Sequence, residues 1–237
     1  MPAEKKKLVV LTGAGISAES GLQTFRDHDG LWMGHRVEDV ATPEAFERNP
    51  ALVMEFYNQR RRNVLAASPN HAHQKLVNPD AFLDVHIITQ NVDDLHERAG
   101  SKNILHLHGE ILKKRSTGPA ELVEPIFTDL AVGESAPDGG IWRPHIVWFG
   151  EAVPMMEQAA DMVEAADALL IIGTSLQVYP AAGLVHARKP GTPVFILDRK
   201  IPEVHAVHPL YSLEETAVAG IDAMIDLILE LVVSDRI

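Results

Sequence analysis

Four short segments of the chain are almost continuously aliphatic, and they constrain the fold more than any other feature of the sequence. They span residues 8–12, 85–89, 168–172 and 193–197. A strand with one face in water alternates apolar and polar residues, whereas a strand covered on both faces by helices does not. The four segments therefore predict central strands of a parallel sheet that is sandwiched between helices.

Helical patterns fill the intervals between these strands. Apolar residues recur at helical spacing over residues 50–67, 71–77, 154–166 and 214–233, and Pro50 stands where a helix start is expected. Regular alternation of strands and helices is typical of a doubly wound parallel sheet. We therefore predict an α/β, Rossmann-like fold.

Two insertions interrupt the alternation. The first, at about residues 27–70, contains no convincing strand, and the second, at about 113–142, is rich in glycine and proline. Shorter strands are predicted nearby, at residues 104–107 and 145–149. We expect a single domain over residues 1–237, with a small helical and loop-rich subdomain formed by the two insertions.

The charge balance and the cysteine count exclude several classes of function. The chain has 21 Lys+Arg against 33 Asp+Glu, a net charge of −12, so we predict no binding to nucleic acid or to anionic membranes. It contains no cysteine, which excludes disulfides, thiolate metal sites and a cysteine nucleophile. The opening segment lacks a secretory signal, and no run approaches the roughly 20 apolar residues of a membrane span. These features predict a cytoplasmic protein.

A glycine-rich loop directly follows the first predicted strand. Gly13, Gly15 and Ala18 satisfy the pattern G-x-G-x-x-G/A between a predicted strand and an expected helix start. Glycine lets backbone N–H groups approach a diphosphate, and a helix N-terminus adds partial positive charge. The alternative interpretation is a structural turn that binds no ligand.

The acidic residue that normally accompanies this loop in a dehydrogenase is not where it should be. Glu38 and Asp39 lie near the usual distance, but no strand precedes them. Asp198 directly follows a predicted strand and is the better candidate for binding a ribose diol. This arrangement argues against an ordinary dehydrogenase.

Five motifs together resemble those of the sirtuins, the NAD-dependent protein deacylases, in family order and spacing over about residues 8–220. They read GAGISAESGLQTFR over residues 13–26, TQNVDDLH over 89–96, LHG over 107–109, RPHIVWFGE over 143–151 and GTS over 173–175. The two insertions also fall where sirtuins keep their small domain. The chain is thus identified by resemblance as a sirtuin-type catalytic domain.

The resemblance implies a reaction in which an acyl-lysine carbonyl attacks C1′ of the nicotinamide ribose of NAD. Nicotinamide leaves, an alkylimidate forms, and the products are free lysine and 2′-O-acyl-ADP-ribose. His108 matches the general base, and Asn91 also matches a catalytic position. His106 shares a strand face with His108, so spacing alone leaves the base open between them; Gly109 after His108 assigns the role by resemblance.

The same resemblance implies a set of NAD-binding residues. They are Gly13, Ala14, Gly15, Glu19, Thr24, Phe25, Arg26, Trp32, Gln90, Asn91, Val92, Asp93, Gly173, Thr174, Ser175, Asp198 and Ala217. Asp198 departs from the family, which usually has asparagine there. Other interpretations remain for some members, since Asn91 or Asp93 could cap a helix and Phe25 could lie in the core.

Tyr57 and Arg60 indicate which acyl group is removed. They resemble the pair that binds the acyl carboxylate in desuccinylase and demalonylase sirtuins, and the spacing i, i+3 puts both on one helix face. Bacterial members with this pair often retain deacetylation, so we expect both activities. The alternative is that residues 60–62, three arginines, form a solvated basic face.

Residues 147–151 are expected to bind the substrate peptide. By resemblance Val147, Trp148, Phe149, Gly150 and Glu151 form the lysine tunnel and an exposed edge for strand addition. The alternative for Val147 and Trp148 is a buried strand. The implied partners are proteins or peptides that carry acylated lysine, and a monomer is the default.

Most sirtuins hold the small domain together with four zinc-binding cysteines, which this chain lacks. Ser116 falls near the first expected cysteine, residues 137–140 replace the second pair, and residues 113–140 contain no histidine. We therefore predict no structural metal. Apolar packing is expected to fix the segment instead, through Leu122, Val123, Ile126, Phe127 and Leu130.

Three other functions compete with NAD-consuming deacylation. A protein ADP-ribosyltransferase is disfavoured by His108 and by the Tyr57 and Arg60 pair. A non-catalytic sensor of NAD or ADP-ribose is disfavoured by intact Asn91, Asp93 and His108, and it would bind NAD without releasing nicotinamide. A hydride-transferring dehydrogenase ranks last.

Overall fold

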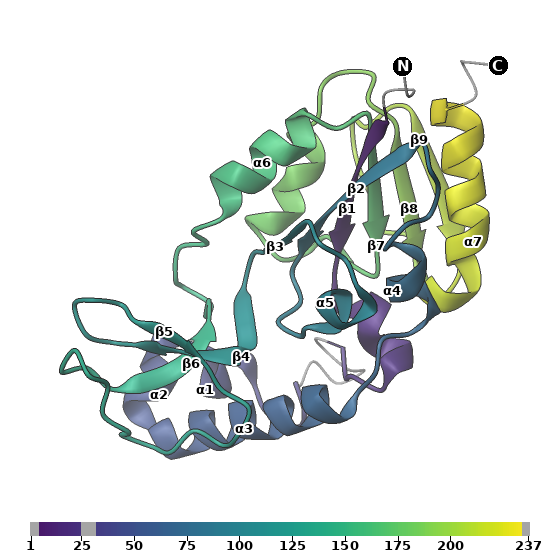
Figure 1. Ribbon diagram of the computed structural model, residues 1–237. Helices are drawn as coiled ribbons and strands as arrows, with labels where there is room; N and C mark the ends of the chain where they lie inside the picture. The colour runs from purple at the N-terminus through teal and green to yellow at the C-terminus, as the bar shows by residue number, and fades with distance from the viewer. Residues whose placement is uncertain (1–4, 25–31, 234–237) are drawn as a thin grey trace.

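A six-stranded parallel sheet forms the centre of the molecule (Figure 1). The computed structural model describes residues 5–24 and 32–233. The strand order is β3-β2-β1-β7-β8-β9, and every neighbouring pair is parallel. The strands are β1 (Lys6–Thr12), β2 (Leu83–Thr89), β3 (Ile104–His106), β7 (Ala168–Ile172), β8 (Val194–Asp198) and β9 (Leu210–Glu214). The predicted doubly wound parallel sheet is confirmed.

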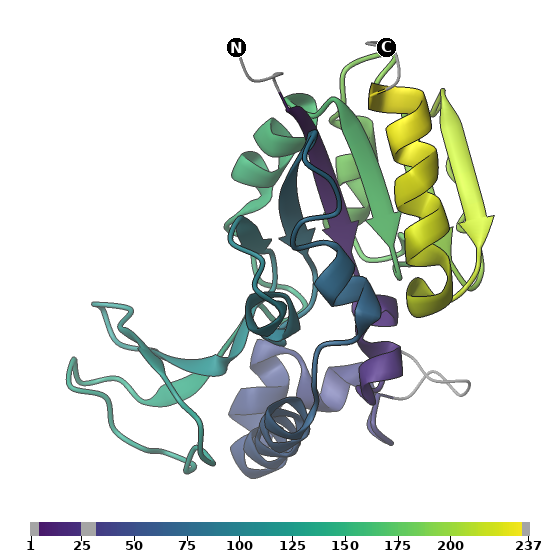
Figure 2. The ribbon, with the colours of Figure 1, turned by 45° about the vertical axis from the view of Figure 1, so that its right-hand side comes forward.

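Helices cover both faces of the sheet, which explains the continuous aliphatic runs. The covering elements are α4 (His71–Lys75), α6 (Met156–Glu164), the 3₁₀-helix η2 (Ala181–His186), α7 (Ala217–Ile228) and its π-helical extension η3 (Leu229–Val233). In β1, Leu8 and Val10 pack toward α4 and α7, whereas Val9 and Leu11 pack toward α6 and η2. Figure 2 shows α6 and α7 on opposite sides of the sheet. Every side chain of β1 from Leu8 onward is therefore buried.

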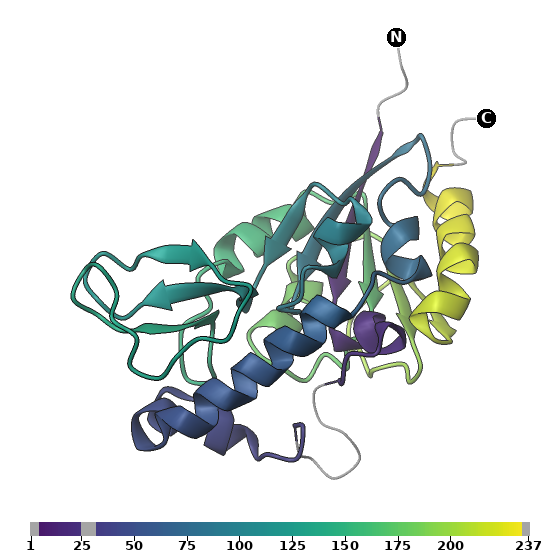
Figure 3. The same cartoon turned by 60° about the horizontal axis from the view of Figure 1, so that its bottom comes forward.

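A second, smaller group of elements lies beside the carboxyl ends of the strands. It contains α1 (Val37–Val40), α2 (Pro43–Arg48), α3 (Pro50–Ala66) and the antiparallel strands β4 (Gly109–Ser116), β5 (Val123–Pro125) and β6 (Trp142–Ile146), in the order β5-β4-β6. Figure 3 shows α3 running from this group toward the main sheet. The long α3 thereby connects the two parts of the molecule.

Local sequence explains where these helices begin. Thr42 and Asn49 accept hydrogen bonds from Ala45 N and Leu52 N, and a proline follows each of them as the first residue of α2 and α3. Within residues 5–24 and 32–233, no helix combines the length and the apolar character that crossing a bilayer would require.

Three predictions about secondary structure are wrong. The segment 113–142 is not loop-rich throughout, because it contains most of β4 together with β5 and the start of β6. The strand expected at 145–149 ends at Ile146, and the helix expected from residue 214 begins at Ala217 because β9 occupies residues 210–214. The missed strands have exposed or charged side chains, so they lack the apolar pattern used to find the others.

Candidate active site

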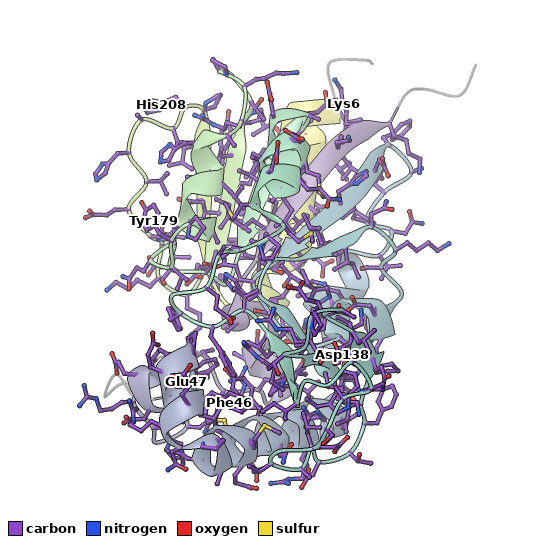
Figure 4. All side chains as sticks on the ribbon, turned by 90° about the vertical axis from the view of Figure 1, so that its left-hand side faces the viewer. Lys6, Phe46, Glu47, Asp138, Tyr179 and His208 are labelled. Atoms are coloured by element: carbon purple, nitrogen blue, oxygen red, sulfur yellow. The ribbon has the colours of Figure 1, made fainter. Side chains whose placement is uncertain are left out.

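A cleft of about 760 Å³ opens at the carboxyl ends of the parallel strands. Segments that follow β1, β2, β7 and β8 form one wall, and α3 and the segment after β6 contribute the other. Figure 4 shows Tyr179 in the part of the molecule that contains the main sheet, and Phe46 and Glu47 of α2 in the smaller group of elements. Open α/β sheets bind their ligands at this edge.

Most of the predicted site residues lie in this cleft. Those that line it are Gly13, Ala14, Gly15, Thr24, Trp32, Tyr57, Arg60, Gln90, Asn91, Val92, Asp93, His108, Val147, Trp148, Phe149, Gly150, Glu151, Gly173, Thr174, Ser175, Asp198 and Ala217. Phe25 and Arg26 lie outside the described residues. Ala18 of the glycine-rich loop lines the cleft as well. Residues that sequence reasoning missed are Ser17, Gln23, Ala41, Ile146, Val153, Val178, Tyr179, Pro180, Leu197, Arg199 and Lys200.

Glu19 does not line the cleft, which differs from its predicted position. Its carboxylate accepts hydrogen bonds from Thr216 Oγ1 at 3.1 Å and Val218 N at 3.0 Å. These groups belong to the first turn of α7, where backbone N–H groups lack helical partners and a negative charge is stabilising. Glu19 therefore fixes the start of α7 against the 3₁₀-helix η1 (Ala14–Ser20).

The loops after β1 and β7 meet through glycine backbone. Gly15 N donates to Gly173 O at 2.8 Å, and a Cβ on Gly15 would lie 2.6 Å from Gly173 Cα. Gly173 has a φ of +63°, and its own Cβ would lie 2.3 Å from Ile16 N. No larger residue fits at either position, so the two loops can approach this closely only through glycine.

A buried polar cluster lies beneath this loop. Ser17 Oγ donates to Asp93 Oδ2 at 3.1 Å, and Asn91 Nδ2 donates to Ser17 Oγ at 3.2 Å. Leu95 N donates to the other carboxylate oxygen of Asp93 at 3.1 Å, which forms an Asx turn, but the N-cap residue of the following helix is Asp94 rather than Asp93. Burial raises the pKa of Asp93. Ser17 lies within the glycine loop motif, and this position was the only sequence signal for its hydrogen bonds to Asp93 and Asn91.

His108 has the geometry of a neutral base. Its Nδ1 lies 3.1 Å from the carbonyl oxygen of Gln90, which can only accept, so Nδ1 carries the proton. Nε2 is therefore left without a proton. Burial lowers the pKa of His108, against the opposing effect of the Gln90 carbonyl, so the ring is uncharged at neutral pH. The ring on the cleft wall can thus accept a proton from a bound hydroxyl.

Three buried donors converge at the small-domain end of the cleft. Within the described residues, no hydrogen-bond partner meets Tyr57 Oη, Arg60 Nε or Trp148 Nε1. Burial raises the pKa of Tyr57 to about 12, against the lowering effects of the nearby Arg60 and Trp148, so the phenol remains a donor. Burial likewise lowers the pKa of Arg60 to about 10, and its guanidinium stacks 4.1 Å from the ring centroid of Trp32.

The neighbouring arginines have other functions, so residues 60–62 do not form one solvated basic face. Arg61 is buried and donates to Ile111 O at 3.0 Å, joining α3 to β4. Arg62 is exposed and pairs with Glu55 and Asp129. Arg60 alone faces the cleft.

Glu151 holds the predicted peptide-binding segment in its shape. Its carboxylate accepts from Arg143 at 2.6 Å, from Arg115 at 2.9 Å and from Trp148 N at 2.8 Å. Burial raises the pKa of Glu151, but the arginine contacts prevail and lower it, so the carboxylate is ionised. The carboxylate of Glu151 is therefore committed to the protein's own groups although the residue borders the cleft.

The opposite end of the cleft carries groups suited to ribose and phosphate. Asp198 accepts from Lys200 N at 3.0 Å through Oδ1, and burial raises its pKa. Arg199 and Lys200 also line the cleft and supply positive charge beside Asp198. NAD fits these residues, because the glycine loops admit its diphosphate and Asp198 can accept from a ribose diol.

Hydrogen bonds brace the corner where zinc cysteines were expected by resemblance. Ser116 Oγ donates to Asp138 Oδ1, and Gly140 N donates to the same oxygen at 3.2 Å. Gly118 N donates back to Ser116 Oγ at 2.9 Å. A Cβ on Gly140 would lie 2.2 Å from Gly118 N, so the close approach of the two turns needs glycine at residue 140. In the part of the chain that the structure describes, no group of three acidic or histidine side chains is arranged to hold a metal ion.

Comparison with known proteins agrees with this architecture. The sequence profile of the Sir2 family matches residues 13–180. The chain is 49% identical over 227 residues to an NAD-dependent protein deacylase of Helicobacter pylori, covering 95% of this chain and 99% of that protein. An enzyme of the same name from Bacteroides thetaiotaomicron is also 49% identical, covering 94% and 98%. The crystal structure of a Sir2 homolog–NAD complex superposes with a TM-score of 0.84 at 38% identity, covering 97% and 92% of the two chains. The chain belongs to the Sir2 family.

Proposed function

We propose that this NAD-dependent protein deacylase removes succinyl and malonyl groups from lysine side chains and also accepts acetyl-lysine. The products are free lysine, nicotinamide and 2′-O-acyl-ADP-ribose, and residues 1–237 act as one catalytic domain. We expect a cytoplasmic monomer that needs no structural zinc. Its partners are acylated proteins rather than nucleic acid or membranes, in keeping with its net charge of −12.

The unpaired buried donors at the small-domain end of the cleft carry the choice of acyl group. A buried donor without a partner is costly, and a guanidinium and a phenol together suit a carboxylate. Tyr57 Oη and Arg60 Nε are such donors, and both residues line the cleft that also contains His108. A succinyl or malonyl group extended past His108 supplies the acceptor that both lack, whereas an acetyl group leaves them unpaired but still fits.

The other residues around the NAD position bind its nicotinamide ribose or transfer a proton. NAD supplies the electrophilic C1′ and the ribose hydroxyls when it is bound. We assign the nicotinamide ribose and carboxamide to Asn91 and Asp93, which Ser17 fixes from below. His108 takes a proton at Nε2, while its Nδ1–H bond to Gln90 keeps the ring in the required tautomer.

A mass-spectrometric assay tests this proposal. The protein is incubated with NAD and with matched acetyl-, succinyl- and malonyl-lysine peptides, beside Tyr57→Phe and His108→Ala. We expect nicotinamide and O-acyl-ADP-ribose from all three peptides, none from His108→Ala, and a selective loss of succinyl and malonyl turnover in Tyr57→Phe. NAD binding with no nicotinamide release on any peptide would instead indicate a sensor, and transfer of ADP-ribose to the peptide would indicate a transferase.

A further inference from the structure

Four consecutive carbonyl groups, at the end of β2 and in the loop that follows it, accept hydrogen bonds from the segment 106–111. The pairs are Leu107 N to Thr89 O at 2.9 Å, His108 Nδ1 to Gln90 O at 3.1 Å, His106 Nδ1 to Asn91 O at 3.1 Å and Ile111 N to Val92 O at 2.8 Å. The outer two bonds come from backbone and do not depend on pH. The inner two come from histidine rings, so the loop that carries Asn91 and Asp93 is held partly by titratable groups.

His106 differs from His108 because both of its ring nitrogens face acceptors. Nδ1 faces the carbonyl of Asn91, and Nε2 lies 2.7 Å from the Glu97 carboxylate on α5 (Leu95–Ala99). Neither an amide carbonyl nor an ionised carboxylate can donate, so both nitrogens must carry hydrogen and the ring is an imidazolium. The side chain is only 10% exposed, and His106 does not line the cleft.

The charged groups around His106 favour its protonated form. Burial alone would lower its pKa, but Glu97 on α5 and Glu110 on β4 outweigh burial, so the pKa of His106 is raised. Glu110 is already paired with Lys113 at 2.6 Å, which leaves Glu97 as the main counter-charge. Burial would raise the pKa of Glu97, but the bond to His106 prevails and lowers it. Asp93 and the neutral His96 also lie within electrostatic reach of His106.

We propose that His106, kept charged by Glu97, is a positioning residue that fixes the Asn91 carbonyl and thereby aligns Asn91 and Asp93 with bound NAD. This inference rests on the assignment of the nicotinamide ribose to those two residues. We call the hydrogen bonds from charged His106 to the Asn91 carbonyl and to Glu97 the clamp. Because the His106 pKa is raised above 6.5, the clamp is fully present below pH 6.5 and is lost as the pH rises through the raised value. Glu97 stays ionised over that whole range, so the clamp weakens only on the alkaline side.

The clamp can be tested by pH profiles of kcat/KM for NAD, measured at saturating acetyl-lysine peptide between about pH 6 and 10. Glu97→Gln keeps an oxygen that can accept from His106 but removes the charge. We expect this variant to lose activity at a pH about one unit or more lower than wild type, as when a hydrogen-bonded counter-charge is removed. Glu110→Gln is the matched control, since it removes a nearby charge without breaking a bond to His106, and its profile should move by less than half as much.

A second variant and a spectroscopic readout complete the test. His106→Gln should lower kcat/KM for NAD about tenfold, the factor expected when one charge-assisted hydrogen bond is lost, and should leave the KM for peptide unchanged. NMR titration of the His106 ring should show an imidazolium at pH 7 and a lower pKa in Glu97→Gln. These ring measurements need no turnover, so they test the clamp even if the proposed deacylation fails. A neutral ring at pH 7, an unmoved Glu97→Gln profile, or an equal rise in the KM for peptide would overturn the proposal.

Discussion

Replacing Arg60 with methionine tests the acyl-carboxylate site most directly. Burial lowers the Arg60 pKa from 12.5 to about 10, which corresponds to about 3 kcal/mol of lost stability for the charged form. Because Arg60 faces an open cleft, solvent in the cleft stabilises the charged guanidinium and reduces this cost. We therefore take about 2 kcal/mol as the stabilisation that a bound carboxylate can add. That energy equals about a thirtyfold difference in kcat/KM. Arg60→Met should therefore lose about thirtyfold on succinyl-lysine and little on acetyl-lysine.

The assay compares kcat/KM for succinyl and acetyl versions of one peptide at saturating NAD. Arg62→Met is the matched control, because Arg62 lies on the same helix but points to solvent and pairs with Glu55 and Asp129. Its succinyl-to-acetyl ratio should equal that of wild type. Methionine can still pack on Trp32, and the substitution removes a buried charge, so the free energy of unfolding of Arg60→Met should be unchanged or higher.

Two results would refute this reasoning. An equal loss on both peptides would mean that Arg60 supports the cleft rather than the acyl carboxylate. A clear drop in the free energy of unfolding would mean that the guanidinium is satisfied in the free protein, which contradicts the cost from which the thirtyfold effect was worked out.

Three further predictions concern pH and the braced corner. Because burial lowers the pKa of His108, kcat/KM for NAD should stay level near neutral pH and fall as the pH drops below 6.5; a fall beginning at higher pH would exclude His108 as the base. Burial lowers the pKa of His73 to about 4 and that of His96 to about 3, so stability is complete above pH 6.5 and lost below it. Urea unfolding at pH 5 should show a loss of about 2 kcal/mol for each ring relative to pH 7, and equal stability at both pH values would contradict this. Asp138→Ala should speed amide hydrogen exchange around residues 116–118 and 138–141, whereas a chelator should leave wild-type exchange unchanged; opening by the chelator alone would indicate a bound metal.

The strands predicted most clearly are those in which consecutive residues are apolar because both faces of the strand are buried. β1, β2, β7 and β8 lie inside the sheet, so both faces of each strand are apolar and a short window reveals them. β9 is an edge strand, and β5 is wholly exposed. Both strands lack a run of buried apolar residues, and their backbone pairing with a distant segment is not recorded in a short window of sequence.

The site shows the same division between local and distant causes. The glycine loop could be identified because its chemistry depends on adjacent residues, whereas the role of His108 could be assigned only through the resemblance of the LHG motif to the family. Glu19 could not be assigned to α7, because its partners lie 197 and 199 residues away in the chain. Arg60, Arg61 and Arg62 are identical residues in sequence, but each step along a helix turns the side chain by about 100°. Arg60 therefore faces the cleft, Arg61 reaches the buried carbonyl of Ile111, and Arg62 points to solvent.

The corner of the small domain held by Ser116 and Asp138 differs from a zinc–thiolate site in its chemical sensitivity to oxidation. A zinc–thiolate site can be dismantled by peroxide, which oxidises its sulfur atoms, or by scarcity of the metal. Here the same corner is held by the hydroxyl of Ser116, the carboxylate of Asp138 and peptide N–H groups, and the chain contains no thiol. Peroxide therefore finds no sulfur atom to oxidise in this corner.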